Sequence, residues 1–162
     1  MHRVLWGLLG ICLLAPSICR SENCAWLNAA TAGGLLGGEV TMNVTHTSPE
    51  DTTCEFTLRH ESTVSTLQIA VHTMTSASQE FPAYLAKCGT VNIPLKAVGN
   101  EALECILNGG SVQVTEQIVG RVRDRAFLIR WTMPKSREEA TSQDDIREKL
   151  RNVAEQVAGS LF

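Results

Sequence analysis

The sequence feature that most constrains the fold is residues 116–133, EQIVGRVRDRAFLIRWTM, in which two alternating runs flank a short polar turn. Alternation with a period of two is typical of β-strands, and two such runs around a turn predict a long β-hairpin. Pairing Val122 with Arg125 places Gly120 opposite Phe127, where the aromatic ring covers the bare backbone of the glycine. We therefore expect this register in the hairpin.

The N-terminus has the composition of a secretory signal peptide. After the basic Arg3, residues 4–15 form an unbroken apolar run that ends at Pro16. A membrane-spanning helix needs ~20 residues, whereas a short apolar run with a small-residue exit is typical of a cleaved signal. We predict that residues 1–21 are removed and that residues 22–162 form one α+β domain. The domain would be secreted or periplasmic, without a stable membrane anchor.

Composition and motifs argue against several functional classes. Loss of Arg3 and Arg20 leaves 12 of the 14 basic residues against 17 acidic ones, a formal charge of −5. This acidic balance does not suggest binding to nucleic acid. The chain contains neither a Gly-x-Ser-x-Gly motif nor a Cys-x-x-Cys pair, which would indicate a serine nucleophile or a zinc site. We expect no cofactor and no metal.

Four cysteines remain after the predicted cleavage, and an even number in an exported chain predicts two disulfides with three possible connectivities. Cys54 shares the core-facing parity of its strand and can meet Cys24, just before the first helix. Cys88 ends the second helix on its apolar face, and Cys105 lies on the next predicted strand. We therefore expect the bonds Cys24–Cys54 and Cys88–Cys105.

The remaining pattern predicts an α+β fold with the order α-β-β-β-α-β-β-β-α. Such an order suggests an antiparallel sheet of about six strands with helices packed mainly on one face. Strands are expected at residues 40–44, 54–58, 67–71 and 102–107 and in the hairpin, and helices at residues 29–36, 76–89 and 142–159. Pro82 is expected in the first turn of the second helix, and residues 90–99 as an extended segment or loop.

The last helix has the most distinct pattern. Ser142 and Asp145 form a capping box, and apolar residues then recur at helical spacing to Leu161. Its exposed side is expected to carry two opposite-charge pairs four residues apart. These pairs are Asp145 with Lys149 and Arg151 with Glu155.

The pattern of most of residues 22–162 resembles that of small exported bacterial α+β domains of unknown function, and two short segments carry the resemblance. Residues 24–27, CAWL, precede an alanine-rich helix and residues 35–37, LLG, as in those families. Residues 97–102, AVGNEA, are similar to their Gly-x-Gly-Asp-x-Ala motif, with Ala97 in place of the first glycine and Asn100 in place of the aspartate. The resemblance implies a PsbP-like α+β sandwich and an extracytoplasmic role. It transfers no catalytic residue.

The best candidate binding site is a cluster of arginines, Arg121, Arg123, Arg125 and Arg130, on the hairpin of an acidic protein. Guanidinium groups suit carboxylate or phosphate partners. The alternative is a solvated hairpin that is paired locally through Asp124 and the acidic helix.

Three histidines survive the predicted cleavage, and they do not predict a metal site. His46 and His72 are expected near the same end of the sheet but on opposite faces, and His60 at the far end. A metal site needs at least two converging ligands, so we interpret these residues as surface or strand-end histidines.

These observations predict an exported, non-catalytic binding or scaffold module of the cell envelope or extracellular space. Its expected partner is an envelope protein or an acidic molecule. The alternative is a secreted hydrolase whose polar residues converge only in the folded chain. A cleft with a buried His–carboxylate or Ser–His pair would favour the hydrolase, whereas a filled core with a flat basic hairpin would favour the module.

Overall fold

A computed structural model describes residues 23–89, 91–107, 112–135 and 142–162. The helices are α1 (Ala29–Leu36), α2 (Ala77–Leu85), the short 3-10 helix η1 (Ala86–Cys88) and α4 (Gln143–Ser160), and the strands are β1 (Thr41–His46), β2 (Asp51–His60), β3 (Thr63–Thr73), β4 (Asn92–Pro94), β5 (Glu101–Ile106), β6 (Gln113–Val122) and β7 (Arg125–Pro134). The predicted signal peptide lies outside the described residues. So do residues 108–110, where the sequence Asn-Gly-Gly predicts a turn, and most of residues 134–141, which the sequence predicts as a polar linker.

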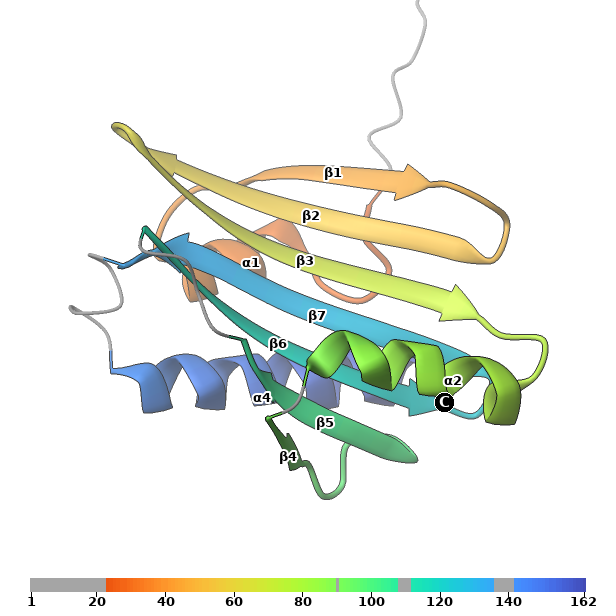
Figure 1. Cartoon of the computed structure of the whole chain (residues 1–162). Coiled ribbons are helices and arrows are strands. Elements are labelled where there is room, and N and C mark those ends of the chain that lie inside the picture. The colour runs from red at the N-terminus through yellow and green to blue at the C-terminus, as the bar shows by residue number, and fades with distance from the viewer. Residues whose placement is uncertain (1–22, 90, 108–111, 136–141) are drawn as a thin grey trace, which may run out of the picture.

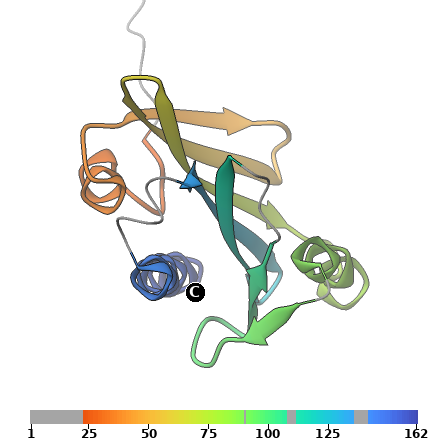
Figure 2. The same cartoon turned by 60° about the vertical axis from the view of Figure 1, so that its left-hand side comes forward.

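The described strands form one antiparallel sheet of seven strands in the order β1-β2-β3-β7-β6-β5-β4. Helices α1 and α4 lie on one face of this sheet, and α2 lies on the other (Figures 1 and 2). The predicted α+β class and the antiparallel sheet are confirmed. The seventh strand is β4, which falls in the segment predicted as extended or loop, and it pairs Asn92 with Cys105 of β5.

The central hairpin has the predicted register. Val122 pairs with Arg125, and Gly120 pairs with Phe127. A Cβ atom at position 120 would overlap the Phe127 ring and lie 3.0 Å from the Cβ of Ala102. The absence of a side chain at Gly120 is therefore what leaves room for the Phe127 ring beside β6.

Two apolar clusters hold the layers together. The main core lies between the sheet and the α1–α4 layer, with Phe56, Phe127 and Ile129 fully buried. The smaller cluster lies on the other face, where Phe81 of α2 packs with Leu128 and other residues. The sheet is thus buried on both faces near β6 and β7, which explains why both residue parities of the hairpin are apolar.

Helix α4 follows its predicted pattern with two differences. The Ser142 hydroxyl accepts a 3.1 Å hydrogen bond from the Asp145 N–H, and Lys149 Nζ lies 2.8 Å from Asp145 Oδ2. The helix continues one residue past its predicted end, to Ser160. Arg151 does not pair with Glu155 as predicted, because it contacts a carboxylate of the sheet, described below.

The second helix is shorter than predicted and begins at Ala77, so Pro82 lies in its second turn rather than its first. Its N-terminus is capped by the Glu80 side chain, which accepts a 2.7 Å hydrogen bond from the Ser76 N–H. Proline favours the first turn of a helix, so Pro82 alone would place the helix start close to residue 82. The Glu80 contact instead stabilises a start at Ala77.

Both predicted disulfides are present. Cys24–Cys54 joins the segment before α1 to β2 in the main core, and Cys88–Cys105 joins η1 to β5 on the α2 face. The first bond therefore attaches the segment before α1 to the sheet, and the second attaches the segment after α2 to the sheet.

The two edges of the sheet differ. Strand β4 has three residues and ends in Pro94, which lacks a backbone donor. Strand β1 has six residues, none of them proline or a charged Lys or Arg, and its outer side meets no described strand.

Candidate functional site

The structure does not gather the four predicted arginines into one patch. Arg121 lies on the α2 face, with Nε 3.4 Å from Glu101. Arg123 lies in the hairpin turn at φ 54°, where its guanidinium is 5.9 Å from the Phe162 ring. Arg125, at the start of β7, lines a hollow of about 130 Å³ near the hairpin turn.

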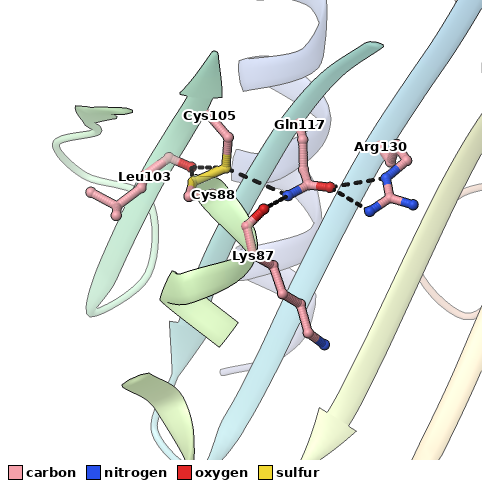
Figure 3. Close-up of a disulfide and its surroundings, with 6 residues drawn as sticks. All are labelled: Lys87, Cys88, Leu103, Cys105, Gln117 and Arg130. Atoms are coloured by element: carbon pink, nitrogen blue, oxygen red, sulfur yellow. Dashed lines mark hydrogen bonds between the residues drawn. A yellow bond between two sulfur atoms is a disulfide. The ribbon is translucent and has the colours of Figure 1, made fainter. Parts of the chain in front are cut away.

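Of the four arginines, Arg130 is held by two hydrogen bonds to a buried side chain (Figure 3). Its Nε and Nη2 donate to Gln117 Oε1 at 2.9 and 2.8 Å. The Gln117 amide nitrogen donates in turn to the Lys87 carbonyl at 3.1 Å and lies 3.6 Å from the Cys105 sulfur. Because Gln117 is fully buried, its oxygen holds one edge of the Arg130 guanidinium in a fixed orientation.

Around Arg130, part of the α2 face is not covered by any described helix. A row of threonines crosses five strands here, in the order Thr41, Thr57, Thr66, Thr132, Thr115. Neighbouring strands lie about 4.8 Å apart, so this row spans roughly 19 Å. The next row contains Asn43, Glu55, Gln68 and Arg130. We call these nine residues the open face.

The open face is polar throughout. Its residues are half-buried or exposed, as expected for side chains on a sheet face that no described helix covers. Thr115 and Thr132 share a 3.3 Å hydrogen bond between their hydroxyls. In Figure 1, α2 lies over β6 and β7 and leaves β1 and β2 uncovered on this side.

His72 is the centre of a second polar cluster, at the edge of α2. Its Nδ1 lies 2.8 Å from Asp51 Oδ1 and its Nε2 lies 3.4 Å from Glu80 Oε2. The Tyr84 ring stacks on it at 5.7 Å. The Ser48 hydroxyl donates to Asp51 Oδ2 at 2.8 Å. The cluster ties α2 to the ends of β2 and β3.

The geometry of this cluster is not that of a nucleophile with its base. A serine is activated when its hydroxyl donates to a histidine, but Ser48 contacts the carboxylate. Both ring nitrogens of His72 face carboxylates, so neither is directed to a substrate. The pKa of Asp51 is lowered mainly by the hydrogen bond from Ser48, and next by the hydrogen bond with His72. The pKa of Glu80 is lowered mainly by its backbone hydrogen bond at Ser76.

A third cluster lies in the main core under α4. Glu104 of β5, only 1% exposed, accepts a 2.8 Å hydrogen bond from Arg151 Nε and lies 3.3 Å from Arg147 Nε. Glu116 of β6, also buried, accepts a 3.0 Å hydrogen bond from Gln143. Buried carboxylates with arginine partners are a common structural arrangement, and here they attach α4 to the sheet.

Sequence reasoning missed Gln117, Glu104 and Glu116. Glu104 and Glu116 each have apolar residues two positions away on both sides along the strand, which is the available signal for a polar side chain in a buried position. Gln117 lacks this signal, because Thr115 lies two positions before it. The strand pattern does not predict the hydrogen-bond partners of these three residues, because the partners of Glu104 and Glu116 lie in α4, and those of Gln117 lie in η1 and β7.

In the part of the chain that the structure describes, no group of three or more His, Cys, Asp or Glu side chains is placed to hold a metal ion. None of the described helices has the length and apolarity needed to cross a membrane. His46 and His72 do lie at the same end of the sheet, where His46 Nδ1 is 2.9 Å from the Thr52 hydroxyl.

No known protein family matches the sequence, and neither the curated proteins nor the solved structures give a significant match. The resemblance to small exported domains therefore stays a prediction, and the function must be argued from the geometry of this chain.

Proposed function

We propose that this protein is an exported, non-catalytic binding module that recognises an acidic protein partner through the open face. The observation that carries the proposal is Arg130, a half-buried cation held by a fully buried glutamine beside an uncovered row of hydroxyls. A surface layer of this kind offers hydrogen bonds without the buried cleft that most small-molecule enzymes use.

The orientation of Arg130 favours recognition of a carboxylate. Gln117 occupies the Nε and Nη2 atoms with one oxygen, and no described residue accepts a hydrogen bond from Nη1. A guanidinium that is already ordered loses less side-chain entropy when a partner binds. An aspartate or glutamate of the partner can therefore pair with it at low entropic cost.

The other three arginines support the same class of partner in a different way. Arg121, Arg123 and Arg125 lie toward the hairpin turn, and two of them are exposed. Exposed charges at the rim of an interface mainly raise the association rate, and salt screens this effect. We infer that they attract the acidic partner, whereas Arg130 orients it.

The disulfides support the exported location. Two bonds between buried cysteines are typical of a non-reducing compartment. The hydrolase alternative has less support, because the His–carboxylate cluster lacks an activated nucleophile and His72 lines none of the described hollows.

Site-specific photocrosslinking tests this proposal. A photoreactive amino acid is placed at Thr66 on the open face, and a matched one at Glu155 on the exposed side of α4. We expect discrete crosslinks to a protein partner from Thr66 in the native compartment and none from Glu155. Arg130→Glu should abolish the Thr66 crosslinks.

Arg125→Glu is the matched control, because it changes the net charge equally but lies at the hairpin turn. Arg125→Glu should slow association with the partner. At low salt it should leave the final yield of the Thr66 crosslinks unchanged. Crosslinks that persist in Arg130→Glu, or that come from Glu155 instead, would contradict the proposal. Thermal melting of each variant shows whether the fold is kept.

A further inference from the structure

A separate cleft lies between α1 and α4, on the face of the sheet opposite to the open face. Its volume is about 170 Å³. The walls come from the end of α1, from β7 and from the first half of α4, and the lining residues are Gly34, Leu35, Gly37, Trp131, Met133, Ile146 and Lys149. Figure 2 shows the two helices side by side over this part of the sheet.

The cleft has a hydrogen-bond donor in its lining. Trp131 is 5% exposed, and its indole Nε1 is buried without an acceptor among the described residues. A buried N–H that makes no hydrogen bond is unfavourable, and most native structures avoid it. An acceptor that reaches this N–H would satisfy it, and the Trp131 side chain is part of the cleft lining.

The cleft also has a cation in its lining. Lys149 Nζ lies 2.8 Å from Asp145 Oδ2, and both side chains are more than one third exposed. An exposed pair of this kind contributes little to stability, so the ammonium can exchange Asp145 for another carboxylate. The remaining lining side chains, Leu35, Met133 and Ile146, are apolar.

Gly34 borders the cleft without a side chain. A Cβ atom at this position would meet no other atom within 4 Å, in contrast to Gly33, where it would lie 2.6 Å from the Gly38 carbonyl oxygen. Local packing therefore requires a glycine at position 33 but not at position 34. A side chain longer than that of alanine at position 34 would have open space to enter beside the cleft.

We propose that this cleft binds a small molecule with an apolar body and a carboxylate. The apolar walls would cover the body, and the carboxylate would meet Lys149, with Trp131 as a donor in the lining. At about 30 Å³ for a water-sized group, 170 Å³ holds five or six such groups. The five-carbon apolar body of a six-carbon carboxylic acid matches that volume, and its carboxylate then lies at the partly exposed Lys149.

Hexanoate is the test probe, and the readout is the indole N–H signal of Trp131 in the NMR spectrum of the oxidised protein. The Trp131→Phe variant assigns the signal. We expect hexanoate to shift it saturably, hexanol to bind more weakly, and acetate to have no effect. The Trp26 indole signal is an internal control that should stay in place.

Two variants locate the binding. Gly34→Leu should weaken hexanoate binding by at least about tenfold, because its side chain fills the cleft. Gly34→Ala is the matched control, which keeps most of the space and should bind normally. Lys149→Gln should weaken binding of hexanoate by about fivefold and leave binding of hexanol unchanged.

The proposal is overturned if hexanoate leaves the Trp131 signal in place up to its solubility limit, or if the shift persists in Gly34→Leu. An equal shift with acetate would also overturn it, because that result indicates a general anion effect. Arg130→Glu should leave hexanoate binding intact, so this experiment succeeds or fails independently of the protein-partner proposal.

Discussion

The Nε atom of Arg151 in α4 donates a 2.8 Å hydrogen bond to Oε2 of Glu104 in β5, a residue 47 positions earlier in the chain. A second contact, from Arg151 Nη2 to the same oxygen at 2.6 Å, makes the pair tighter. Apolar packing alone would allow α4 to slide along the sheet, since its apolar stripe repeats every turn. The Glu104 carboxylate marks one position at which α4 can dock.

Arg151→Met is expected to lower the free energy of unfolding by about 1–3 kcal/mol, because it removes hydrogen bonds from a buried carboxylate. Denaturant unfolding measures the change. Lys149→Met on the same helix breaks an exposed pair and should change stability by no more than about 1 kcal/mol. Equal effects of the two variants would argue against a special role for Glu104.

Gly120→Val is expected to destabilise the protein by about 1–3 kcal/mol. The new side chain would overlap the Phe127 ring, which has no free space to move into because it is fully buried. Gly159→Ala is the control, since a Cβ atom there meets nothing within 4 Å. It should leave stability unchanged or raise it by up to about 1 kcal/mol. An unchanged melting temperature for Gly120→Val would contradict the packing.

Acid is expected to weaken the attachment of α2. The pKa of Asp51 in the folded protein is below its ordinary value of 3.8. A lowered folded pKa means that the ionised carboxylate contributes stability above the unfolded pKa, and that this stability is lost as the pH falls through the folded pKa. The stability difference between wild type and Asp51→Asn should therefore shrink from about pH 5 to about pH 2.

Ser48→Ala should reduce the same difference, because the Ser48 hydroxyl is the main cause of the lowered pKa of Asp51. Ser78→Ala, an exposed hydroxyl of α2, should keep the full acid dependence. If wild type and Asp51→Asn lose stability in parallel on acidification, Asp51 does not contribute in this way.

The two disulfides are expected to act on different layers. They close loops with sequence separations of 30 and 17 residues, and by chain entropy each contributes roughly 3–4 kcal/mol. Replacing Cys24 and Cys54 with alanine should speed amide hydrogen exchange in α1. Replacing Cys88 and Cys105 should speed it in η1 and around Gln117. Exchange that rises equally everywhere would contradict this division.

The features that sequence reasoning predicted correctly depend on local or near-local interactions. The hairpin register follows from strand alternation and from one glycine opposite an aromatic residue. The disulfides join segments close in sequence, and the capping box at Ser142 depends on residues three apart. In each case the relevant partners are visible together in a short stretch of the chain.

The features that were missed depend on contacts between distant segments. The sequence near Arg151 does not indicate that it pairs with Glu104 rather than with Glu155. Glu104 is buried only because α4 packs over it, and this packing is not visible in the local sequence. The same holds for Arg130 and Gln117, whose setting requires η1 above the hairpin. The four arginines are close in sequence, but Arg123 lies in the hairpin turn, and Arg125 lies on the face of the sheet opposite to Arg121 and Arg130.

The unequal edges of the sheet limit how copies of this protein can associate. The β4 edge is short and blocked by Pro94, whereas β1 presents an extended backbone without a charged Lys or Arg or a proline to discourage pairing. A subunit with one usable edge has a valence of one. Edge-to-edge contact between two copies would use up both β1 strands and close as a symmetric pair, so growth would end at two rather than propagate into a fibre.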